Sequence, residues 1–407
     1  MRILFVSDNF PPETNAPATR VYEHAVRWVR EGHQVTVLTC APNFPEGELH
    51  EGYANRWRAI EVVEGVRVVR VKTFITANEG FFLRTLDYLS FMVMAFATGL
   101  FEPRPDVVVA TSPQFFSAVA GWALSVAKWR PFVFELRDLW PASITAVGAM
   151  RKSAIIRALE SLELFLYRRA AAIVSVTESF REELASRGID RRKIYVIVNG
   201  VDLARFEPRP RDAGLVKELG LDGRFVVGYL GTHGMAHGLP AVLEAASRLD
   251  ERRDIAFLFA GSGAERARVE QVVSERRLSN VRLVARQPKD KMPALWSVCD
   301  VSLVPLRNSP LFAKVIPSKM FESMAMGVPI LMSLPEGEAT RLVCETGAGV
   351  CVPPEDADAM ASAIRRLADQ PQLVSRMREA ALKAAPRFSR DAGAAEMGRV
   401  LEAVCAA

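Results

Sequence analysis

The stretch Val315-Ile-Pro-Ser-Lys-Met-Phe-Glu-Ser-Met-Ala-Met-Gly-Val-Pro329 carries the signals of a short helix. Ser318 is a candidate N-cap, and Gly327 ends the helix after about two turns. Lys319 and Glu322 are three residues apart, a spacing that brings two side chains to one face of a helix. We therefore interpret this stretch as a helix that presents a cation and a carboxylate together.

The pair suits one class of ligand. A lysine at a helix N-terminus favours an anion, because the backbone amides and the helix dipole attract negative charge there. A carboxylate one turn further along accepts hydrogen bonds from a diol. An anion beside a diol is the outline of a nucleotide sugar, with its diphosphate near Lys319 and its ribose hydroxyls on Glu322. The alternative interpretation is an amphipathic helix with a solvated ion pair.

Length and composition indicate the number of domains, the class of protein and the kinds of partner. A chain of 407 residues exceeds one compact core, so two domains are expected. Its 50% hydrophobic and 24% charged content is typical of a soluble α/β protein. The net charge of +5 suits acidic ligands or an anionic membrane face. No nucleic-acid-binding module is recognisable, so a nucleic-acid partner is not expected.

Five cysteines lack any CxxC or metal-ligand spacing and indicate buried thiols in a reducing compartment: Cys40, Cys299, Cys344, Cys351 and Cys405. The chain begins with a strand pattern, Arg2–Ser7, so we expect no signal peptide and a cytoplasmic location. Clusters typical of zinc sites and the GxSxG signature of hydrolases are missing from the sequence. We therefore expect neither a metal nor another cofactor.

The most apolar stretch is 81–101, which Arg84 and Asp87 interrupt. The uninterrupted run from Leu89 to Phe101 is too short to cross a bilayer. One interpretation is a buried helix. The other is a helix half inserted in the membrane interface, with nearby cations meeting anionic head groups: Arg84, Arg56, Arg58 and Lys72.

The first half of the chain alternates short apolar runs with helical periodicity. The strands are expected at Arg2–Ser7, Gln34–Thr39, Val66–Lys72, Asp106–Thr111, Phe132–Leu136, Ala171–Val176 and Lys193–Val198. The helices are expected at Ala18–Arg30, Phe81–Leu100, Gln114–Lys128, Ser153–Arg169 and Glu178–Arg187. Such alternation predicts a parallel, doubly wound sheet.

A Pro-rich, charged segment, Phe206-Glu-Pro-Arg-Pro-Arg-Asp212, then interrupts the periodicity and is the expected linker. A second series of strands follows: Arg224–Leu230, Ile255–Ala260, Val281–Val284, Val301–Pro305, Val328–Met332 and Gly349–Val352. The fold class is therefore α/β, with two tandem Rossmann-like domains at 1–205 and 206–389. Ligands of such sheets bind at the carboxyl ends of the strands, so we expect the two domains to face a cleft.

Two loops of the first domain carry candidate residues. The loop after the first strand is unusually long and brings Asn15, Thr19 and Arg20 towards the expected cleft, unless it only caps the sheet. Phe134-Glu-Leu-Arg-Asp-Leu-Trp-Pro141 places Arg137 and Asp138 just past a strand end. The alternative for this second loop is an ion pair that merely closes it.

Two turns of the second domain suit phosphates, because glycines let backbone amides approach a ligand. They are Gly228-Tyr-Leu-Gly-Thr-His-Gly-Met-Ala-His-Gly238 and Ala260-Gly-Ser-Gly263. Neither has the GxGxxG spacing of a dinucleotide site, which disfavours an oxidoreductase. Asp356-Ala-Asp358 matches a metal-binding DxD pattern, but it begins a helix after two prolines, so we favour capping over metal binding.

Six motifs extend this pattern over the whole chain: Phe10-Pro-Pro-Glu13, Gly32-His-Gln-Val-Thr-Val-Leu-Thr39, Pro42-Asn-Phe-Pro-Glu-Gly47, Arg137-Asp-Leu-Trp-Pro141, Asn199-Gly-Val-Asp202 and Ile316-Pro-Ser-Lys-Met-Phe-Glu322. Together they resemble glycosyltransferase family 4, retaining enzymes of the GT-B architecture. They are most similar to L-fucosamine transferases of bacterial envelope polysaccharide synthesis. The last helix, 390–407, resembles the segment that crosses back onto the first domain.

The resemblance implies roles for individual residues. The donor-binding set is Gly231, Thr232, His233, His237, Gly261, Gly263, Gln287, Lys314, Ser318, Lys319 and Glu322. The acceptor-side set is Asn15, Thr19, Arg20, Asp138 and Trp140, and the catalytic set is Asp138, Arg137, Lys319 and Glu322. The chain departs from the family at Lys314, which replaces a glutamate, at Thr232 and His237, which replace Arg and Lys, and at Arg137, which replaces a histidine. Lys314 and Lys319 are expected to supply the missing positive charge.

The expected activity is transfer of a sugar from a nucleotide-diphosphate donor, a UDP-N-acetylamino sugar, to a lipid-linked or glycan hydroxyl. The resemblance implies retention of the anomeric configuration without a metal, and we expect a cytoplasmic protein that is peripheral at the membrane. Two other functions stay open. One is a sugar-nucleotide epimerase of the same architecture, and the other is a catalytically silent nucleotide-sugar binder. The oligomeric state is open as well.

Overall fold

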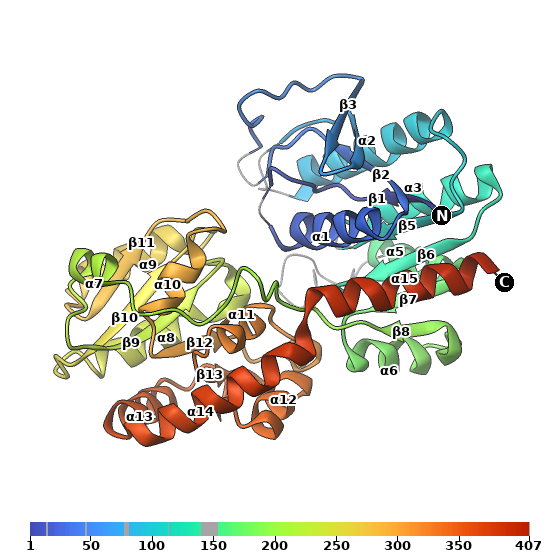
Figure 1. Cartoon of the computed structure of the whole chain (residues 1–407). Coiled ribbons are helices and arrows are strands. Elements are labelled where there is room, and N and C mark those ends of the chain that lie inside the picture. The colour runs from blue at the N-terminus through green and yellow to red at the C-terminus, as the bar shows by residue number, and fades with distance from the viewer. Residues whose placement is uncertain (14, 45–46, 77–80, 113, 140–153, 407) are drawn as a thin grey trace. The chain divides into compact units, whose positions relative to one another are not determined.

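A computed structural model of the chain describes residues 1–13, 15–44, 47–76, 81–112, 114–139 and 154–406 (Figure 1). These residues form two compact units, one of Met1–Val198 with Arg390–Ala407 and the other of Asn199–Ser389. The division lies before the predicted linker, because Val201 pairs with the second unit: its N–H donates to the Phe388 carbonyl at 2.8 Å.

The first unit contains an eight-stranded sheet in the order β3-β4-β2-β1-β5-β6-β7-β8. Its strands are β1 (Arg2–Val6), β2 (Gln34–Cys40), β3 (Arg58–Val63), β4 (Val66–Val71), β5 (Val107–Thr111), β6 (Phe132–Leu136), β7 (Ala172–Ser175) and β8 (Ile194–Val196). All neighbours are parallel except β3, which is antiparallel to β4. The seven predicted strands are confirmed, and only the edge strand β3 was missed.

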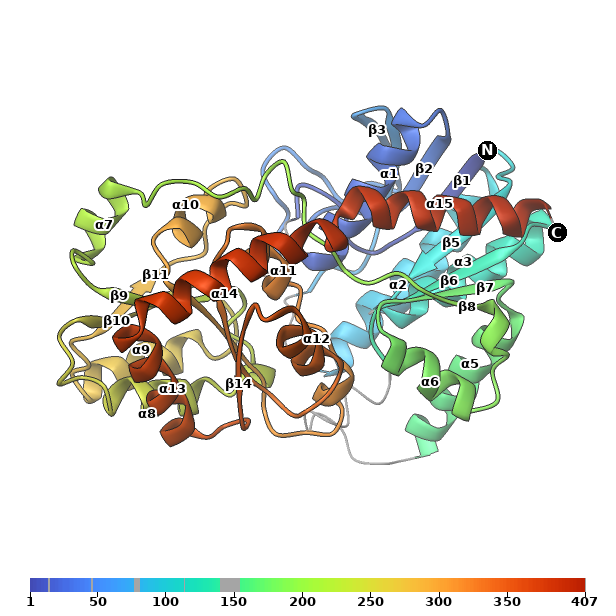
Figure 2. The ribbon, with the colours of Figure 1, turned by 60° about the horizontal axis from the view of Figure 1, so that its bottom comes forward.

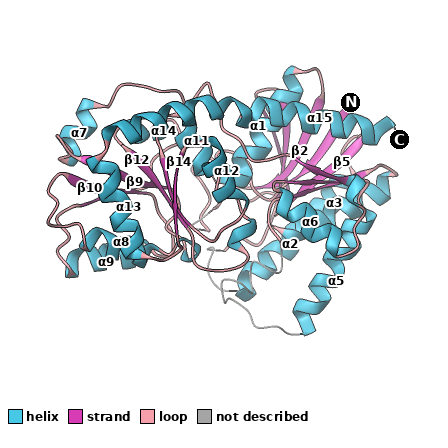
Figure 3. Cartoon of the chain, turned by 90° about the horizontal axis from the view of Figure 1, so that it is seen from below, coloured by secondary structure: helices cyan, strands magenta, loops and turns pink. Residues whose placement is uncertain are grey.

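Helices cover both faces of this sheet (Figure 3). They are α1 (Ala16–Arg30), α2 (Phe81–Leu100), α3 (Phe115–Lys128), α5 (Ala154–Arg169), α6 (Glu178–Ser186) and α15 (Arg390–Ala406). On one face α1 packs against α15, where the Trp28 indole donates to the Ala394 carbonyl at 2.9 Å and Arg390 pairs with Glu23. On the other face α2 packs against α3. A side chain at Gly121 would press on Ala110 of β5, so a glycine is needed for α3 to lie close to the sheet.

The α2 helix confirms the predicted bounds but not a fully buried position. Phe91 and Ala95 are buried, whereas Leu83, Leu86, Val93 and Leu100 are exposed. Among the described residues no helix is long and apolar enough to cross a membrane.

The second unit contains a parallel six-stranded sheet in the order β11-β10-β9-β12-β13-β14. The strands are β9 (Phe225–Leu230), β10 (Ile255–Ala260), β11 (Val281–Val284), β12 (Val301–Pro305), β13 (Ile330–Ser333) and β14 (Gly349–Val352), which confirms all six predictions. The helices are α7 (Ala213–Leu219), α8 (Leu239–Ser247), α9 (Arg266–Glu275), α10 (Met292–Ser297), α11 (Lys319–Ala325), α12 (Glu338–Thr346), α13 (Ala357–Asp369) and α14 (Pro371–Ala384).

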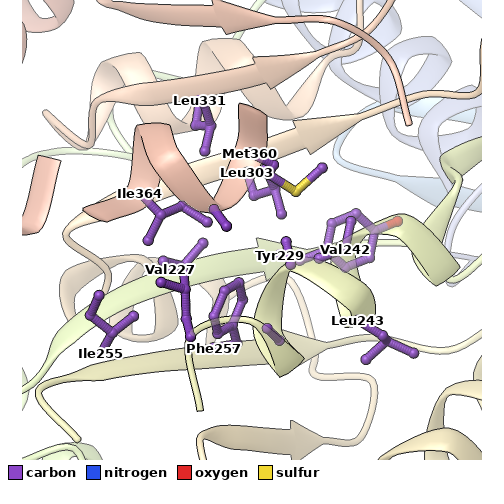
Figure 4. Packing of buried hydrophobic residues seen from close by; sticks show 14 of the residues in the cluster. Val227, Tyr229, Val242, Leu243, Ile255, Phe257, Leu303, Leu331, Met360 and Ile364 are labelled. Carbon is purple, nitrogen blue, oxygen red and sulfur yellow. The ribbon is translucent and has the colours of Figure 1, made fainter. Parts of the chain in front are cut away.

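The core of the second unit lies between the sheet and two of these helices (Figure 4). Apolar side chains of four strands meet those of α8 and α13: Val227, Tyr229, Ile255, Phe257, Leu303 and Leu331 with Val242, Leu243, Met360 and Ile364. Helices α11 and α14 contact each other, and α11 also contacts β12 and β13 (Figure 2). This packing holds the first turn of α11 close to the ends of the strands.

Local signals explain most helix ends. The Asn15 side chain accepts from the Ala18 N–H at 2.9 Å and caps α1. The Asp356 side chain accepts from the Ala359 N–H at 2.8 Å, so the predicted cap of α13 is confirmed. The prediction that Ser318 caps α11 is wrong, because Ser318 has helical backbone angles (φ −61°, ψ −28°) and makes no side-chain capping bond. The predicted end at Gly327 is confirmed by its φ of +68°.

Candidate functional site

In the second unit the two glycine-rich turns pack directly on each other. Gly231 follows β9, and Gly261 and Gly263 follow β10, all three with φ between +139° and +149°. A Cβ atom on Gly261 would lie 1.9 Å from the Gly231 carbonyl oxygen, and one on Gly263 would lie 2.7 Å from the His233 carbonyl oxygen. The His233 N–H donates to the Ser262 carbonyl at 2.8 Å. Glycine is therefore required here by the contact of two backbones and by the positive φ.

Lys319 lies at the start of α11, next to the first of these turns. Its Nζ atom is buried, is 3.9 Å from the centre of the Tyr229 ring, and has no hydrogen-bond partner among the described residues. A Cβ atom on Gly231 would lie 3.3 Å from this nitrogen. Burial lowers the pKa of Lys319 to about 7, although the Glu322 carboxylate opposes the shift. An ammonium group with three unused donors is thus held beside a turn that suits phosphates.

Two histidines complete what we call the Lys319 cluster, which is Tyr229, His233, His237, Phe259 and Lys319. The His233 ring lies 5.5 Å from the Tyr229 ring and 6.1 Å from the Phe259 ring, and the His237 ring lies 6.0 Å from the Tyr229 ring. Burial, followed by nearby cations, lowers the pKa of His233 to about 4 and that of His237 to about 3. Both histidines are therefore neutral near pH 7, and positive charge in the cluster comes from Lys319.

The remaining donor-side candidates lie on other turns of the second unit or on α11. The Thr232 carbonyl accepts from the Tyr229 hydroxyl at 2.5 Å. Glu322 lies in the first turn of α11, and its carboxylate acts on Lys319. Lys314 ends a short 3-10 turn, Phe312–Lys314, that precedes α11. Gln287 belongs to the turn after β11, where its side-chain amide donates to the Ala285 carbonyl at 3.4 Å rather than to the cluster.

In the first unit Arg20 belongs to a buried ion pair. Its Nε donates to the Glu135 carboxylate at 2.7 Å, and both side chains are buried. Burial alone would raise the pKa of Glu135, but Arg20, Arg137 and His24 together lower it to about 2. Burial also lowers the pKa of His24 well below its usual value. Arg20 thus ties α1 to the centre of the sheet.

Arg137 and Asp138 follow β6, where the N–H groups of both residues donate to the Ser112 hydroxyl at 2.8 and 3.3 Å. The Nε and Nη1 atoms of Arg137 are buried without a hydrogen-bond partner among the described residues, and burial lowers its pKa to about 10. Thr19 is buried on α1, and its N–H donates to the Asn15 carbonyl at 3.0 Å. Trp140 lies outside the described residues.

Two family models divide the chain between them. The model described as Glycosyltransferase Family 4 matches residues 17–205, and the model described as Glycosyl transferases group 1 matches residues 215–384. Together the two matches make the chain a glycosyltransferase with a family 4 domain followed by a group 1 domain. The specific similarity to L-fucosamine transferases is not established by these matches.

One sequence relative and two solved structures each match nearly the whole length of the glycosyltransferase. WcaI of Escherichia coli K12, named for glycosyl transfer in colanic acid biosynthesis, is 26% identical over 378 residues, which are 90% of this chain and 92% of the relative. Sucrose-phosphate synthase from Thermosynechococcus elongatus superposes with a TM-score of 0.81 at 19% identity, covering 100% of this chain and 99% of that one. Anabaena HepE in complex with UDP-glucose gives 0.73 at 16% identity, covering 99% and 100%. The predicted GT-B fold is confirmed.

Several buried residues with notable surroundings in the two units were missed in the sequence. Tyr229 was missed although it lies within the first glycine-rich stretch, and Glu135 although it interrupts an apolar strand. Carboxylates near the end of β1 were also missed. Burial raises the pKa of Asp8 well above its usual value and that of Asp87 to about 7. Asp8 comes directly after the strand-end residue Ser7, a position that could have drawn attention to it.

Proposed function

We propose that this glycosyltransferase takes its sugar from a UDP-linked donor whose diphosphate binds at the Lys319 cluster. The observation that carries the proposal is the buried Lys319 ammonium, which lacks a hydrogen-bond partner among the described residues and lies beside Gly231. A buried cation without a partner is costly unless a ligand compensates it. A diphosphate supplies the charge and the acceptor oxygens that Lys319 lacks.

The same geometry suits the chemistry of transfer. Negative charge grows on the departing diphosphate while the anomeric carbon becomes oxocarbenium-like, so a fixed cation at the phosphate lowers the barrier. Lys319 provides that cation, and the backbone amides of the glycine turns add donors. We assign the ribose hydroxyls to Glu322, in the first turn of α11, because a carboxylate accepts hydrogen bonds from a diol. Neutral His233 and His237 are suited to hydrogen bonding rather than to charge neutralisation.

The acceptor side is assigned to the first unit. We propose that Arg137 and Asp138, just past the end of β6, line the site for the sugar and the acceptor hydroxyl. Retention of configuration, with a leaving phosphate oxygen taking the acceptor proton, rests on the family resemblance. In that scheme neither a protein base nor a metal is required.

The relatives are consistent with a UDP-sugar donor and with polysaccharide synthesis. HepE, which shares the fold, is recorded in complex with UDP-glucose, and WcaI is named for colanic acid biosynthesis. We extend these to a UDP-N-acetylamino sugar as donor, a lipid-linked or glycan hydroxyl as acceptor, and envelope polysaccharide synthesis as the process.

A lipid-linked acceptor requires contact with a membrane, and α2 offers a suitable surface. Its outward side is apolar along its length, at Leu83, Leu86, Val93 and Leu100. Phe101 and Trp129, 84% and 85% exposed, continue this side at the end of the helix. There the Lys128 ammonium donates to the Leu100 carbonyl at 3.1 Å, which places the end of α3 beside the end of α2.

Exposed cations and aromatic rings elsewhere in the first unit also match an anionic bilayer. Arg104, which is exposed, donates to the Lys128 carbonyl at 3.0 Å, and Lys72 lies 5.3 Å from the exposed Trp57 ring. Trp rings and basic side chains beside an apolar stripe are typical of helices that lie in the membrane interface. We therefore propose that α2 holds the enzyme at the cytoplasmic membrane face as a peripheral protein.

One assay separates the proposed activity from its two rivals. The full chain is incubated with UDP-N-acetylamino sugars, with and without a lipid-linked acceptor, and both UDP and the donor are analysed by chromatography. We expect UDP release that depends on the acceptor, together with a product of retained configuration. An isomerised donor in the absence of acceptor would indicate an epimerase. UDP binding without release or isomerisation would indicate a silent binder.

A further inference from the structure

Two thiols of the second unit lie in contact away from the Lys319 cluster. Cys344 is in the last turn of α12 and Cys351 is in the edge strand β14, which packs against α12. Their sulfur atoms are 3.8 Å apart. Gly347, with φ +68°, reverses the chain between them. A disulfide is about 2.05 Å long, so the sulfur atoms need to approach by roughly 1.8 Å to form one.

The other three cysteines are placed differently. Cys40 and Cys299 are buried, and the exposed Cys405 donates its thiol hydrogen to the Asp106 carbonyl at 3.7 Å. The prediction that all five thiols are buried is therefore wrong for Cys344 and Cys405, which are exposed, and for Cys351, which is half-buried. Among the five, only Cys344 and Cys351 combine solvent access with a neighbouring thiol.

Exposure assigns the two thiols different roles. Cys344 is open to a reagent in solution, whereas burial raises the pKa of Cys351 to about 12 and the Cys344 sulfur adds to that shift. A bond on Cys344 removes this second cause, because a disulfide sulfur carries no negative charge. Cys344 is thus the thiol that reacts first, and Cys351 is the one that resolves the product.

We propose that Cys344 and Cys351 are a modification site that forms a reversible intramolecular disulfide with a low-molecular-weight disulfide, RSSR, as oxidant. The Cys344 thiolate attacks one sulfur of RSSR and releases one RS⁻, which leaves a mixed disulfide on Cys344. The Cys351 thiolate then attacks the Cys344 sulfur and releases the second RS⁻. The two protein thiols lose two protons and two electrons, and RSSR is reduced to two RSH molecules.

The test uses the full-length chain with oxidised glutathione as the probe. The reduced protein is incubated with it, free thiols are alkylated, and the protein is digested with trypsin. Both cysteines lie between Arg341 and Arg365 without an intervening Lys or Arg, so they leave on one peptide. We expect this peptide to lose the mass of two hydrogen atoms, to carry no glutathione and no alkyl group, and to regain both thiols after reduction.

Three comparisons make the outcome decisive. In Cys351→Ser, Cys344 should retain glutathione, because the resolving thiol is missing, while Cys344→Ser should carry no glutathione at Cys351. Cys405 provides an internal control, since it is exposed and should retain glutathione in the wild type. Thermal unfolding of both serine variants confirms that the fold is intact. Glutathione retained on Cys344 of the wild type, or two alkylated thiols while Cys405 is modified, would overturn the proposal.

Discussion

Each unit buries cations near the carboxyl ends of its parallel strands, and two of them, Arg20 and Lys319, are held in opposite ways. In the first unit Arg20 is 2.7 Å from the Glu135 carboxylate, and the pair ties α1 to the sheet. In the second unit Lys319 rests on the Tyr229 ring without a hydrogen-bond partner among the described residues. A buried cation that is paired with a carboxylate stabilises the fold. A buried cation without a hydrogen-bond partner is instead available to bind an anionic ligand.

The largest expected effect comes from removing the uncompensated cation. Lys319→Met should lower kcat/KM for sugar transfer by about 100-fold or more, because the charge on the departing diphosphate loses its counter-ion. The same change should raise the melting temperature, since it removes a buried ammonium. Steady-state kinetics and thermal unfolding measure the two effects. A rate near that of the wild type would contradict the assignment of Lys319 to the donor.

Removing Arg20, the cation that is paired with a carboxylate, should lower the stability of the fold instead of raising it. Arg20→Met leaves the Glu135 carboxylate in a buried position without its closest partner, so we expect a loss of about 3–5 kcal/mol in the free energy of unfolding. Chemical denaturation measures this loss. The double variant Arg20→Met with Glu135→Gln should recover part of it. A stable single variant would show that the ion pair does not hold α1.

The pH dependence of donor binding sharpens the comparison further. Burial lowers the pKa of Lys319 to about 7, so above pH 7 a growing fraction of the free protein has a neutral lysine. Diphosphate binds the protonated form, and UDP affinity should therefore fall as pH rises, approaching about tenfold per pH unit well above the pKa. Titration of UDP between pH 7 and 9 measures this decline. In Lys319→Met the decline should disappear.

The lowered pKa of Lys319 also determines whether the free energy of unfolding rises or falls with pH. Between the folded pKa of about 7 and the usual value of 10.5, the unfolded chain binds more protons at Lys319 than the folded chain does. Lys319 therefore makes a contribution to the free energy of unfolding that rises with pH across this window. The difference between wild-type and Lys319→Met melting temperatures should accordingly shrink as pH rises. A constant difference would argue against a buried ammonium.

The two units also differ in the apolar side chains that they expose. A substitution on the apolar surface of the first unit is expected to have a smaller effect, on membrane binding. All the exposed large apolar side chains of the described residues belong to the first unit, except Met235. Val93→Glu on α2 should weaken binding to vesicles that contain anionic lipid by about tenfold, the ratio that corresponds to 1.4 kcal/mol. Vesicle sedimentation measures this change, and Met235→Glu is the matched control. Gel filtration reports whether the same face instead joins two copies.

The smallest expected effect concerns a motif that resembles a metal site. Asp356 caps α13 through the Ala359 N–H at 2.8 Å. Asp356→Ala should therefore cost about 1 kcal/mol of unfolding free energy. Thermal unfolding measures this cost, and transfer rates with and without a chelator should change equally in both proteins. A selective loss of metal-dependent activity would point to metal binding instead.

Elements with strong local signals could be predicted from the sequence. The apolar run Phe132–Leu136 is β6 with the predicted bounds, and Phe81–Leu100 is α2. Strand β3 was missed because Arg58 and Glu61 break its apolar pattern, and it gains its stability by pairing with β4. In each case the composition of the segment determined whether the helix or strand could be predicted from the sequence.

The residues of the candidate site also divide into those that a local pattern predicts and those that long-range packing brings together. Lys319 and Glu322 were predictable because their spacing and the neighbouring glycine are written in one short stretch. The Tyr229 ring beneath Lys319 was not, because the contact joins residues of β9 and α11 that are 90 positions apart in the sequence. The Arg20–Glu135 pair joins residues that are 115 positions apart, so no local pattern reveals it. The absence of a Ser318 capping bond likewise depends on the backbone angles that the preceding turn imposes.

The central claim is that Lys319 receives the diphosphate of the donor, and calorimetric titration of UDP tests it most directly. Wild type, Lys319→Met and Lys217→Met are compared at pH 7, the last being an exposed lysine on α7. We expect Lys319→Met to weaken UDP binding by about 10- to 100-fold, the range for a charge-assisted contact of roughly 1.5–3 kcal/mol. Lys217→Met should bind UDP as the wild type does. Equal affinity of all three proteins would contradict the claim.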